Sequence, residues 1–239
     1  MDSPRTTSGP DAVTGAGAAR RGTRTLHVGD GLQWLDGATL LPTHAIVTSM
    51  PDASELPSMS FEAWRAWFVA AATRLCERTV DESVTVFYQT DVLREGRWVD
   101  KGHLVATAAE RAGAACLFHK VVCRAPAGST TFGRPGYAHL MAFSRNLRVP
   151  PAAASADVLP GLGEMSWSRA MGTAACEATA QFLLRATPCR TVIDPFCGLG
   201  TMLAVANAYG LDAVGIERSR RRAARARRLT FELGAGLVR

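Results

Sequence analysis

The sequence of 239 residues predicts an α/β protein, with a mostly parallel sheet and helices on both of its faces. Short runs rich in Val, Ile, Phe and Tyr alternate with longer segments of helical period, which is the pattern of consecutive βαβ units. A Gly-rich turn over residues 194–201 directly follows one strand-like run, as ligand-binding turns of parallel sheets do. We therefore expect one α/β domain over residues 23–239.

Residues 1–22 have a different composition from the rest of the chain. They are rich in Ser, Thr, Gly, Pro and Ala and show no apolar periodicity. Such a segment cannot bury enough apolar surface to offset the entropy lost on ordering it, so we expect a disordered tail. A transit peptide is the weaker interpretation, because Asp2 and Asp11 interrupt it.

The remaining chain divides into strand-like and helix-like segments. Strands are expected at residues 25–28, 45–48, 83–89, 115–122, 137–143, 191–193 and 213–216. Helices are expected at residues 60–78, 101–112, 168–186, 201–209 and 218–233. In the first helix, Trp64 and Phe68 recur at helical spacing and are expected to face a core, with Ser60 as the N-cap. Residues 150–163 are expected to form a loop.

The composition indicates an ordinary globular protein, with 47% hydrophobic and 20% charged residues. No apolar run reaches the ~18–20 residues that cross a bilayer, and no secretory-type segment opens the chain. A cytoplasmic protein without a membrane partner is the expectation. The six cysteines form no C-x-x-C pair and no His/Cys ligand cluster, so we expect reduced, mostly buried thiols and no metal site.

The net charge of +6 favours a polyanionic partner, but only weakly. Much of the excess positive charge lies in the Arg-rich residues 218–228. This segment is compatible with a helix that contacts nucleic acid and equally with a helix that has a solvated basic face.

The Gly-rich turn has the sequence Asp194-Pro195-Phe196-Cys197-Gly198-Leu199-Gly200-Thr201. Its glycines allow a sharp turn and a close approach of the backbone to a ligand. Glu217 ends the next strand about 20 residues later, where a carboxylate can accept the hydroxyls of a ribose. The run does not match a P-loop, and it lacks the third glycine of the dinucleotide-binding motif.

This run closely resembles motif I of the amino-group (N6-adenine and N4-cytosine) nucleic-acid methyltransferases. The resemblance implies S-adenosyl-L-methionine as cofactor and a class I, Rossmann-like fold with a seven-stranded sheet. Because motif I lies near the C-terminus, the order resembles that of the circularly permuted, β-class members. The cofactor-binding residues that the resemblance implies are Asp30, Thr173, Asp194, Pro195, Phe196, Cys197, Gly198, Gly200, Thr201 and Glu217.

The same resemblance places the catalytic motif, [DNS]-P-P-[YFW], on Ser49, Met50, Pro51 and Asp52. In the family, the first residue and the following carbonyl orient the target amino nitrogen, and the aromatic residue stacks on the flipped base. This sequence has Met50 for the first Pro and Asp52 for the aromatic residue. Three interpretations remain open: Ser49 still orients an amino nitrogen, Asp52 acts as a general base for another acceptor, or the loop is inactive. In the first, the stacking residue would be Tyr88, Trp98 or Tyr137.

Basic and aromatic side chains are interleaved in the middle of the chain, as expected for gripping phosphates and stacking bases. The candidate nucleic-acid-binding residues are Arg94, Arg97, Trp98, Lys101, Lys120, Arg124, Arg134 and Tyr137. Polar loops at the edge of an α/β sheet are the alternative interpretation. We expect no catalytic role for His119 or His139.

The expected function is therefore methyl transfer from S-adenosyl-L-methionine to an amino nitrogen of a base in nucleic acid. RNA is slightly favoured over DNA, because residues 147–163 are too few for a separate target-recognition region. The alternatives are a non-catalytic methyltransferase-like binding subunit and a methyltransferase that acts on a small molecule or a protein. A homodimer or an activating partner subunit is compatible with the sequence.

Overall fold

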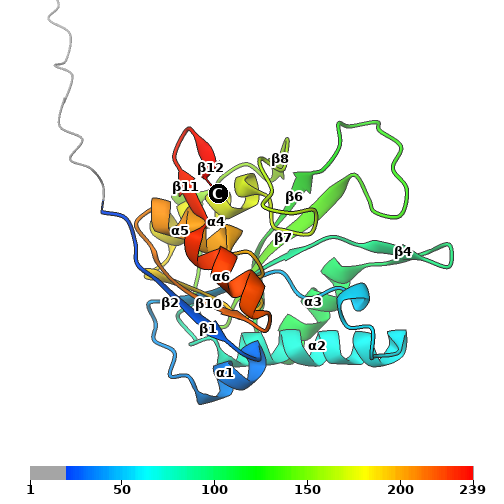
Figure 1. Cartoon of the computed structure of the whole chain (residues 1–239), viewed down its shortest axis with the longest axis horizontal. Helices are drawn as coiled ribbons and strands as arrows, with labels where there is room; N and C mark the ends of the chain where they lie inside the picture. Colours follow the sequence, from blue (N-terminus) through cyan, green and yellow to red (C-terminus); the bar gives the residue numbers. More distant parts are fainter. Residues whose placement is uncertain (1–19, 239) are drawn as a thin grey trace, which may run out of the picture.

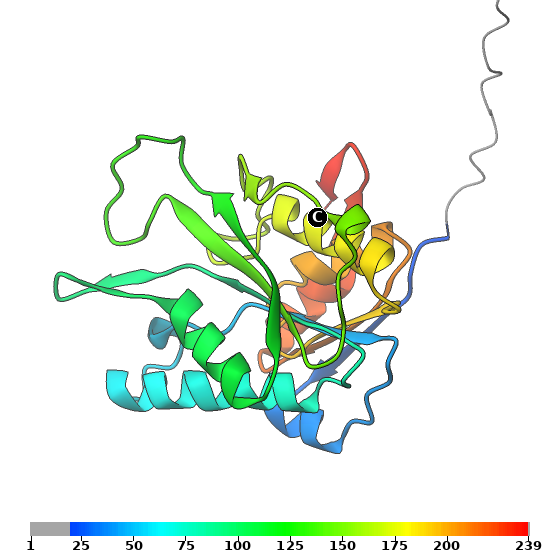
Figure 2. The ribbon, with the colours of Figure 1, turned by 180° about the vertical axis from the view of Figure 1, so that it is seen from behind.

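The computed structural model describes residues 20–238, so nearly all of the tail expected over residues 1–22 lies outside the described residues. Its centre is an eight-stranded sheet in the order β1-β10-β9-β2-β3-β7-β6-β8 (Figure 1). Seven of these strands correspond to the expected ones, and the eighth, β8, has only two residues. Figures 1 and 2 show α1, α2 and α3 on one face and α4, α5 and α6 on the other. The predicted α/β class is confirmed.

The elements have the following bounds. The strands of the main sheet are β1 (Arg24–Val28), β2 (His44–Thr48), β3 (Thr85–Gln89), β6 (Ala115–Cys123), β7 (Tyr137–Ser144), β8 (Val158–Leu159), β9 (Thr191–Asp194) and β10 (Asp212–Glu217). The helices are α1 (Gly31–Gly37), α2 (Phe61–Arg78), α3 (Lys101–Arg111), α4 (Thr173–Ala186), α5 (Thr201–Ala208) and α6 (Arg220–Arg228). Two short hairpins, β4–β5 (Val92–Arg94, Arg97–Val99) and β11–β12 (Thr230–Glu232, Gly236–Val238), and two 3-10 turns, η1 (Ala53–Glu55) and η2 (Pro151–Ala153), complete the described chain.

The direction of chain progression reverses between β9 and β2. Strands β1, β10, β9, β2 and β3 are parallel, and β7 is antiparallel to both β3 and β6. From β9 the chain moves through α5 to β10 on one side, whereas from β2 it moves through α2 to β3 on the other. Ligands of open α/β sheets bind at such a switch point, outside the carboxyl ends of the strands.

The position of β9 explains the late Gly-rich turn. This strand is central in the sheet although it lies near the C-terminus, so its neighbours β2 and β3 come from far earlier in the chain. The permuted order expected from the sequence is therefore confirmed at the level of the fold.

Two apolar layers hold the helices on the sheet. On one face α2 buries Trp64, Phe68 and Leu75, each fully shielded from solvent, and Ser60 caps the helix by accepting from the backbone N–H of Ala63 at 3.1 Å. Burial of each such side chain is worth roughly 1.5–3 kcal/mol, so α2 is firmly fixed to the sheet. On the other face α5 is buried along nearly its whole length.

Two helix boundaries differ from the expected ones. Helix α4 begins at Thr173 rather than at residue 168, because Gly172 is extended and packs so closely that a Cβ there would lie 2.2 Å from the Leu162 carbonyl oxygen. Helix α6 ends at Arg228 rather than near residue 233. Beyond it the backbone is extended, and Leu229 and Phe231 are both buried. Residues two apart lie on the same side of an extended chain, so this spacing of apolar residues favours a strand over a helix.

Besides β8 and the two 3-10 turns, a short helix and two hairpins were not expected from the sequence. Helix α1 has seven residues and follows Asp30 as its N-cap. The β4–β5 hairpin turns at Glu95 and Gly96, both with positive φ, as a two-residue hairpin turn requires. The β11–β12 hairpin replaces the end of the last expected helix.

No helix within residues 20–238 combines the length and the apolar character that a membrane crossing needs. Four of the six cysteines, Cys76, Cys176, Cys189 and Cys197, are buried.

Candidate active site

A pocket of about 620 Å³ lies at the carboxyl ends of β9, β10 and β2. Its volume is within the ~300–1,000 Å³ range of small-molecule sites. The Gly-rich turn after β9 forms its floor, Glu217 lies at the end of β10, and Ser49 and Met50 follow β2. The pocket therefore occupies the switch point of the sheet.

The Gly-rich turn is fixed by its own backbone. The N–H of Cys197 donates to the Ile216 carbonyl on β10 at 3.1 Å, and the N–H of Gly200 donates to the Cys197 carbonyl at 2.7 Å. Gly200 has φ +77°, and a Cβ there would lie 3.0 Å from the Ala226 Cβ of α6. Gly198 has φ +55° and faces open space, with Trp167 Nε1 as the nearest atom to its hypothetical Cβ at 3.9 Å. Any side chain at Gly198 would therefore occupy the pocket.

Asp194 is a buried carboxylic acid at the pocket floor. Its Oδ1 accepts a hydrogen bond from the Thr48 hydroxyl at 2.6 Å and another from the Phe196 N–H at 3.1 Å. Burial raises the pKa of Asp194 to about 7, and the nearby Glu217 charge adds to this, although the two hydrogen bonds act in the opposite direction. A cation in the pocket would favour the ionised form of this group.

Glu217 lies in the wall of the same pocket, and its carboxylate is oriented by the backbone. Its Oε1 accepts from the Ser219 N–H at 2.8 Å, at the start of the turn that leads into α6. Trp167 and Met171, from the segment before α4, supply apolar surface opposite, and the Arg222 guanidinium lies 4.8 Å over the Trp167 ring. The pocket thus places the carboxyl groups of Asp194 and Glu217, at the ends of two neighbouring strands, beside an apolar wall.

The Ser49–Asp52 loop, defined by the four residues after β2, is anchored to the helices α2 and α3. Trp64 Nε1 of α2 donates to the Pro51 carbonyl at 3.1 Å. The Asp52 carboxylate caps η1 and forms an ion pair of 2.9 Å with the Lys101 ammonium of α3. Ser49 and Met50 lie between the large pocket and a narrow neighbouring recess, and both line the two cavities.

The ion pair determines the charge state of Asp52. Burial acts to raise the pKa of this carboxyl, but the charge and hydrogen bond of Lys101, together with two hydrogen bonds from Ser54, outweigh burial and hold the pKa below its ordinary value. A carboxylate of lowered pKa that is already engaged by an ammonium is a weak proton acceptor. This arrangement favours a positioning role for Asp52 over the general-base interpretation.

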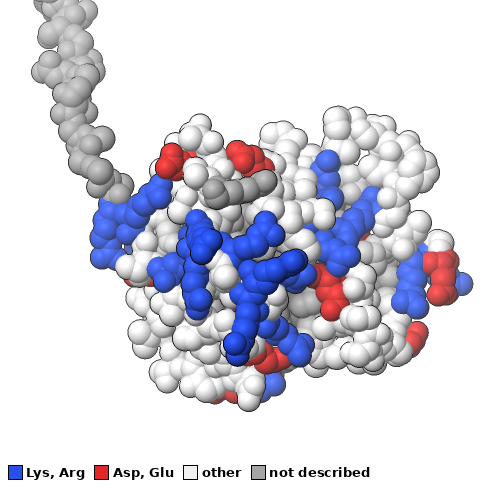
Figure 3. All heavy atoms as spheres, viewed as in Figure 1, with Lys and Arg blue, Asp and Glu red and all other residues white. Residues whose placement is uncertain are grey.

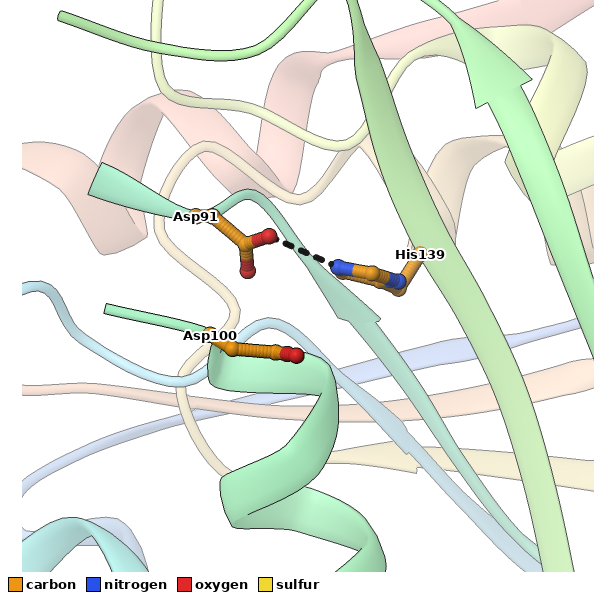
Figure 4. Close-up of side chains that lie close together, drawn as sticks. All are labelled: Asp91, Asp100 and His139. Carbon is orange, nitrogen blue, oxygen red and sulfur yellow. Dashed lines mark hydrogen bonds and ion pairs between the residues drawn. The ribbon is translucent and has the colours of Figure 1, made fainter. Parts of the chain in front are cut away.

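Lys101 is held in turn by a second polar cluster, shown in Figure 4. Asp91 Oδ1 accepts from the Lys101 backbone N–H at 2.8 Å, and Asp91 Oδ2 lies 3.1 Å from His139 Nε2. Asp100 caps α3 by accepting from the His103 N–H at 2.7 Å. One carboxylate oxygen from each of Asp91 and Asp100 and one ring nitrogen of His139 all lie within 4.8 Å of one another. Because both carboxylates bind the N-terminus of α3, we assign this cluster to holding that helix and Lys101 in place.

The predicted nucleic-acid-binding residues fall into two groups. Arg94, Arg97 and Trp98 lie on the exposed β4–β5 hairpin, with the Trp98 side chain 51% exposed. Arg124, Arg134 and Tyr137 belong to the loop between β6 and β7 or to its end, and the two arginines line the narrow recess.

The remaining two candidates, Lys101 and Lys120, are inside the protein. The Lys120 ammonium donates to the Ala156 carbonyl at 2.9 Å and to the Ser155 carbonyl at 3.1 Å, and Lys101 is paired with Asp52. Both side chains are almost fully buried, so their placement argues against the phosphate contacts expected from the sequence. The Lys120 ammonium stabilises the segment before β8 at the edge of the sheet, and the Lys101 ammonium stabilises the Ser49–Asp52 loop.

Three of the expected cofactor-binding residues lie outside the lining of the large pocket: Asp30, Thr173 and Gly200, the last of which packs against Ala226 of α6. Asp30 caps α1 by accepting from two backbone N–H groups, and the adjacent Gly31 packs against the Pro195 carbonyl. The Thr173 hydroxyl accepts from the Glu164 N–H at 2.9 Å. Conversely, Thr48 was not singled out in the sequence, although its position at the end of a strand next to β9 makes it the partner of Asp194.

A basic surface surrounds the pocket mouth. Figure 3 shows Lys and Arg side chains gathered over α6, and Arg218, Arg221 and Arg222 line the pocket itself. The opposite side of α6 is apolar, with Ala223 and Ala226 buried against the sheet. This division into an apolar inner side and an arginine-rich outer side leaves the guanidinium groups at the entrance.

Fold and pocket together define an α/β protein with a permuted strand order and a pocket at the carboxyl ends of its central parallel strands. No family model and no curated protein matches the sequence. Among solved structures, a putative DNA modification methylase from Thermus thermophilus is similar with a TM-score of 0.65 and 17% identity, over 85% of this chain and 92% of that chain. The cytosine-N4-specific PvuII DNA methyltransferase gives a TM-score of 0.68 and 13% identity, over 87% and 86% of the two chains.

A third similar structure is that of the M1.HpyAVI–SAM complex, with a TM-score of 0.56 and 14% identity, over 86% of this chain and 98% of that chain. At these identities the likeness establishes the fold. The sequence-based resemblance to class I methyltransferases is confirmed at that level.

Proposed function

We propose that this chain is an S-adenosyl-L-methionine-dependent methyltransferase that acts on an amino nitrogen of a base in DNA. The observation that carries the proposal is the juxtaposition of the Gly-rich turn and the Ser49–Asp52 loop around one pocket at the switch point. The domain responsible is taken to span residues 23–239.

The residues of the large pocket fit the proposed cofactor. The open space before Gly198 admits a ligand that a Cβ would block. Glu217, at the end of β10, is placed as a ribose-binding carboxylate is in related sheets. Asp194 supplies a buried negative charge for the cationic amino group, and Trp167 and Met171 supply apolar surface. When bound, the cofactor supplies an activated methyl group.

Ser49 and the Met50 backbone are the candidates for holding the acceptor nitrogen. Both lie where the large pocket meets the recess, and the Trp64–Pro51 hydrogen bond fixes the backbone that carries them. A hydroxyl and a carbonyl that accept hydrogen bonds from the two N–H groups of the amino nitrogen would aim its lone pair at the methyl group, which is catalysis by positioning. The paired state of Asp52 favours this interpretation over a general-base mechanism.

DNA is proposed as the polymer because two similar structures are described as DNA methyltransferases or methylases. The preference for RNA that we expected from the sequence receives no support from these comparisons. The β4–β5 hairpin and the β6–β7 loop extend from the same side of the molecule, joined by a 3.1 Å hydrogen bond from the Leu93 N–H to the Gly133 carbonyl (Figures 1 and 2). They carry Trp98 and Phe132, of which Phe132 is 91% exposed. We infer that these two elements serve in place of a separate target-recognition region.

A non-catalytic binding subunit is the second candidate. It is motivated by Met50 and Asp52, which replace two of the four residues of the family's catalytic motif. Binding of S-adenosyl-L-methionine without methyl transfer to any acceptor would favour it.

The test is transfer of tritium from labelled S-adenosyl-L-methionine into genomic DNA, tRNA and rRNA, followed by mass spectrometry of the nucleosides. Label in DNA, recovered as a methylated amino group of adenine or cytosine, is the expected result. Label confined to RNA would overturn the choice of polymer. No label in any nucleic acid would contradict the proposed function.

A further inference from the structure

A narrow polar recess adjoins the large pocket on the side away from the Gly-rich turn. It shares Ser49 and Met50 with the large pocket and continues to Tyr88, Gln89 and Arg124. The recess therefore begins at the group proposed to hold the acceptor nitrogen, and a side chain in its wall would meet the rest of the acceptor base.

Gln89 is the unusual residue of this wall. It is the last residue of β3, which lies between β2 and β7 in the interior of the sheet, so its backbone is rigidly placed. The residue is only 2% exposed, yet its Nε2 has no hydrogen-bond partner among the described residues. A buried donor left without a partner costs ~1–3 kcal/mol, and native proteins almost always satisfy such groups. The amide is therefore matched to a partner that a ligand brings.

The required partner is a hydrogen-bond acceptor, because Nε2 can only donate. In adenine and in cytosine, the ring nitrogen next to the amino-bearing carbon is an acceptor. In guanine and thymine, the corresponding ring nitrogen carries a proton and would oppose a donor. A donor at this point of the recess thus selects adenine and cytosine, which carry an amino group where guanine and thymine carry a carbonyl group.

The surroundings fit a nucleotide base rather than a peptide or an anion alone. The Tyr88 ring lies in the wall, and its hydroxyl interacts with Arg124 and Thr90. Arg124 and Arg134, from the β6–β7 loop, line the outer part of the recess, where the backbone of a nucleic acid would lie. The cavity holds only about 30 Å³, so these loop side chains must move outward when a base enters.

We propose that Gln89 is a specificity-determining residue, which donates from Nε2 to the ring acceptor beside the target amino group. This inference rests on the proposed function and adds to it the rule by which the site accepts adenine or cytosine and rejects guanine and thymine.

The test measures binding by fluorescence anisotropy, in the presence of S-adenosylhomocysteine so that no reaction occurs. The probes are single-stranded oligo(dA) and oligo(dC), each compared with its deaza analogue, in which carbon replaces the ring acceptor nitrogen. The proteins are the unmodified chain, Gln89→Leu, which removes the donor at nearly constant size, and Gln33→Leu, a matched control on the exposed side of α1.

The unmodified chain and Gln33→Leu should bind one parent oligonucleotide at least about tenfold more tightly than its deaza analogue, as expected for the loss of one buried hydrogen bond. Gln89→Leu should bind parent and analogue within about twofold of each other, because the donor that distinguishes them is gone. An equal affinity of the unmodified chain for parent and analogue of both bases would overturn the proposal. So would a preference that Gln89→Leu retains.

The labelling assay separates this inference from the proposed function. Label in DNA together with an unchanged deaza preference in Gln89→Leu would remove the role of Gln89 and leave methyl transfer standing. A preference that depends on Gln89, without any label in nucleic acid, would retain base recognition and contradict catalysis.

Discussion

At the scale of single residues, the chemistry of the site depends on buried polar groups whose partners are incomplete. Asp194 accepts two hydrogen bonds, but burial, with the Glu217 charge adding to it, raises the pKa of this carboxyl. The Asp52 carboxylate is the contrasting case, because the Lys101 ammonium completes it and lowers its pKa. The first group is therefore available to a cationic ligand, whereas the second is committed to the protein.

The raised pKa of Asp194 predicts that cofactor affinity depends on pH. Below about 7 the free protein holds a proton on this carboxyl, and a cationic ligand must displace it. Affinity should fall by up to about tenfold per pH unit below 7 and level off above it. Calorimetry between pH 5.5 and 8 should show proton release at the acidic end, and Asp194→Asn should bind weakly with no such dependence. A constant affinity across this range would show that Asp194 does not meet the cation.

The same group should influence the stability of the cofactor-free protein. A carboxyl whose folded pKa is raised favours folding below its ordinary value near 3.8, and this contribution is lost as pH rises to about 7. Asp194→Asn should therefore raise the free energy of unfolding at pH 8, by up to about 4 kcal/mol, with the gain shrinking toward pH 4. Urea denaturation at the two pH values measures it. If the substitution changes the free energy of unfolding equally at pH 8 and pH 4, the buried charge of Asp194 is not the cause of the change.

Ser49 is predicted to act on turnover rather than on cofactor binding. Removing its hydroxyl in Ser49→Ala should lower kcat by about 10–100-fold, because the amino nitrogen loses one of its two orienting acceptors. The Kd for S-adenosyl-L-methionine should stay within about twofold, since the Gly-rich turn is untouched. Ser58→Ala, an exposed serine of the same connection, is the matched control. A Ser49→Ala variant with normal kcat would remove this residue from the mechanism.

At the scale of elements, the Ser49–Asp52 loop is positioned by two helices at once. Helix α2 holds the Pro51 carbonyl through Trp64, and α3 holds the Asp52 carboxylate through Lys101. The N-terminus of α3 is in turn fixed by Asp91 and Asp100. Each helix therefore contributes an anchor to a loop that has no regular structure before η1.

Breaking the Asp52–Lys101 pair from one side should destabilise the protein. Lys101→Met leaves a largely buried carboxylate without its cation, at a cost of about 3 kcal/mol. Asp52→Asn combined with Lys101→Met should recover at least half of this loss, because no charge then remains. Because the pKa of Asp52 is lower in the folded protein than in the unfolded chain, the pair stabilises the fold at pH values above the ordinary carboxyl pKa. This stabilisation is lost as the pH falls through the lowered pKa of the folded protein. Guanidinium denaturation at pH 7 and pH 3 measures both effects. A single variant within about 0.5 kcal/mol of the unmodified chain would contradict this account.

The elements that sequence could predict are those with a strong periodic pattern. The apolar spacing of α2 and the β-branched content of β3 and β9 are local signals, and these elements form where expected. The start of α4 and the end of α6 were wrong because tertiary contacts of Gly172 and Phe231 decide them. The seven-residue helix α1 and the three-residue strands of the β4–β5 hairpin are too short to show a period.

The candidate site was predictable to a similar degree. The Asp194–Thr201 run and Glu217 are continuous or evenly spaced in sequence, so their joint placement in a pocket followed from the motif. Gln89 and the Lys101–Asp52 pair depend on parallel strands and helices meeting in space, which one-dimensional spacing does not encode. Lys120 was predicted to contact nucleic acid because composition does not show that its side chain is buried.

At the scale of the whole molecule, positive charge and the pocket mouth lie on one face. The chain has a net charge of +6, and basic side chains gather over α6 on the face that Figure 3 shows. The β4–β5 hairpin and the β6–β7 loop extend beyond the same sheet edge as the recess (Figure 1). A nucleic acid that places a base in the recess would therefore run close to both surfaces.

This layout predicts a steep dependence of DNA affinity on salt. Replacing Arg225 and Arg228 of α6 by Glu should weaken binding of duplex DNA and reduce the slope of log Kd against log salt by about one for each phosphate that the helix no longer neutralises. Arg111→Glu, on α3 at the other face of the sheet, should change neither quantity. Anisotropy at graded salt provides the measurement. If the slope stays the same after the two arginines of α6 are replaced by Glu, this helix does not contact DNA and its basic side is simply exposed to solvent.

Calorimetry with S-adenosyl-L-methionine tests whether the Gly-rich turn forms the proposed cofactor pocket. Gly198→Val puts a side chain into the pocket, whereas Gly113→Val is matched in positive φ and open surroundings but lies after α3, far from the turn. We predict that the unmodified chain and Gly113→Val bind with similar affinity, and that Gly198→Val binds at least about 100-fold more weakly. Binding by Gly198→Val as tight as by the unmodified chain, or no binding by the unmodified chain, would contradict the account.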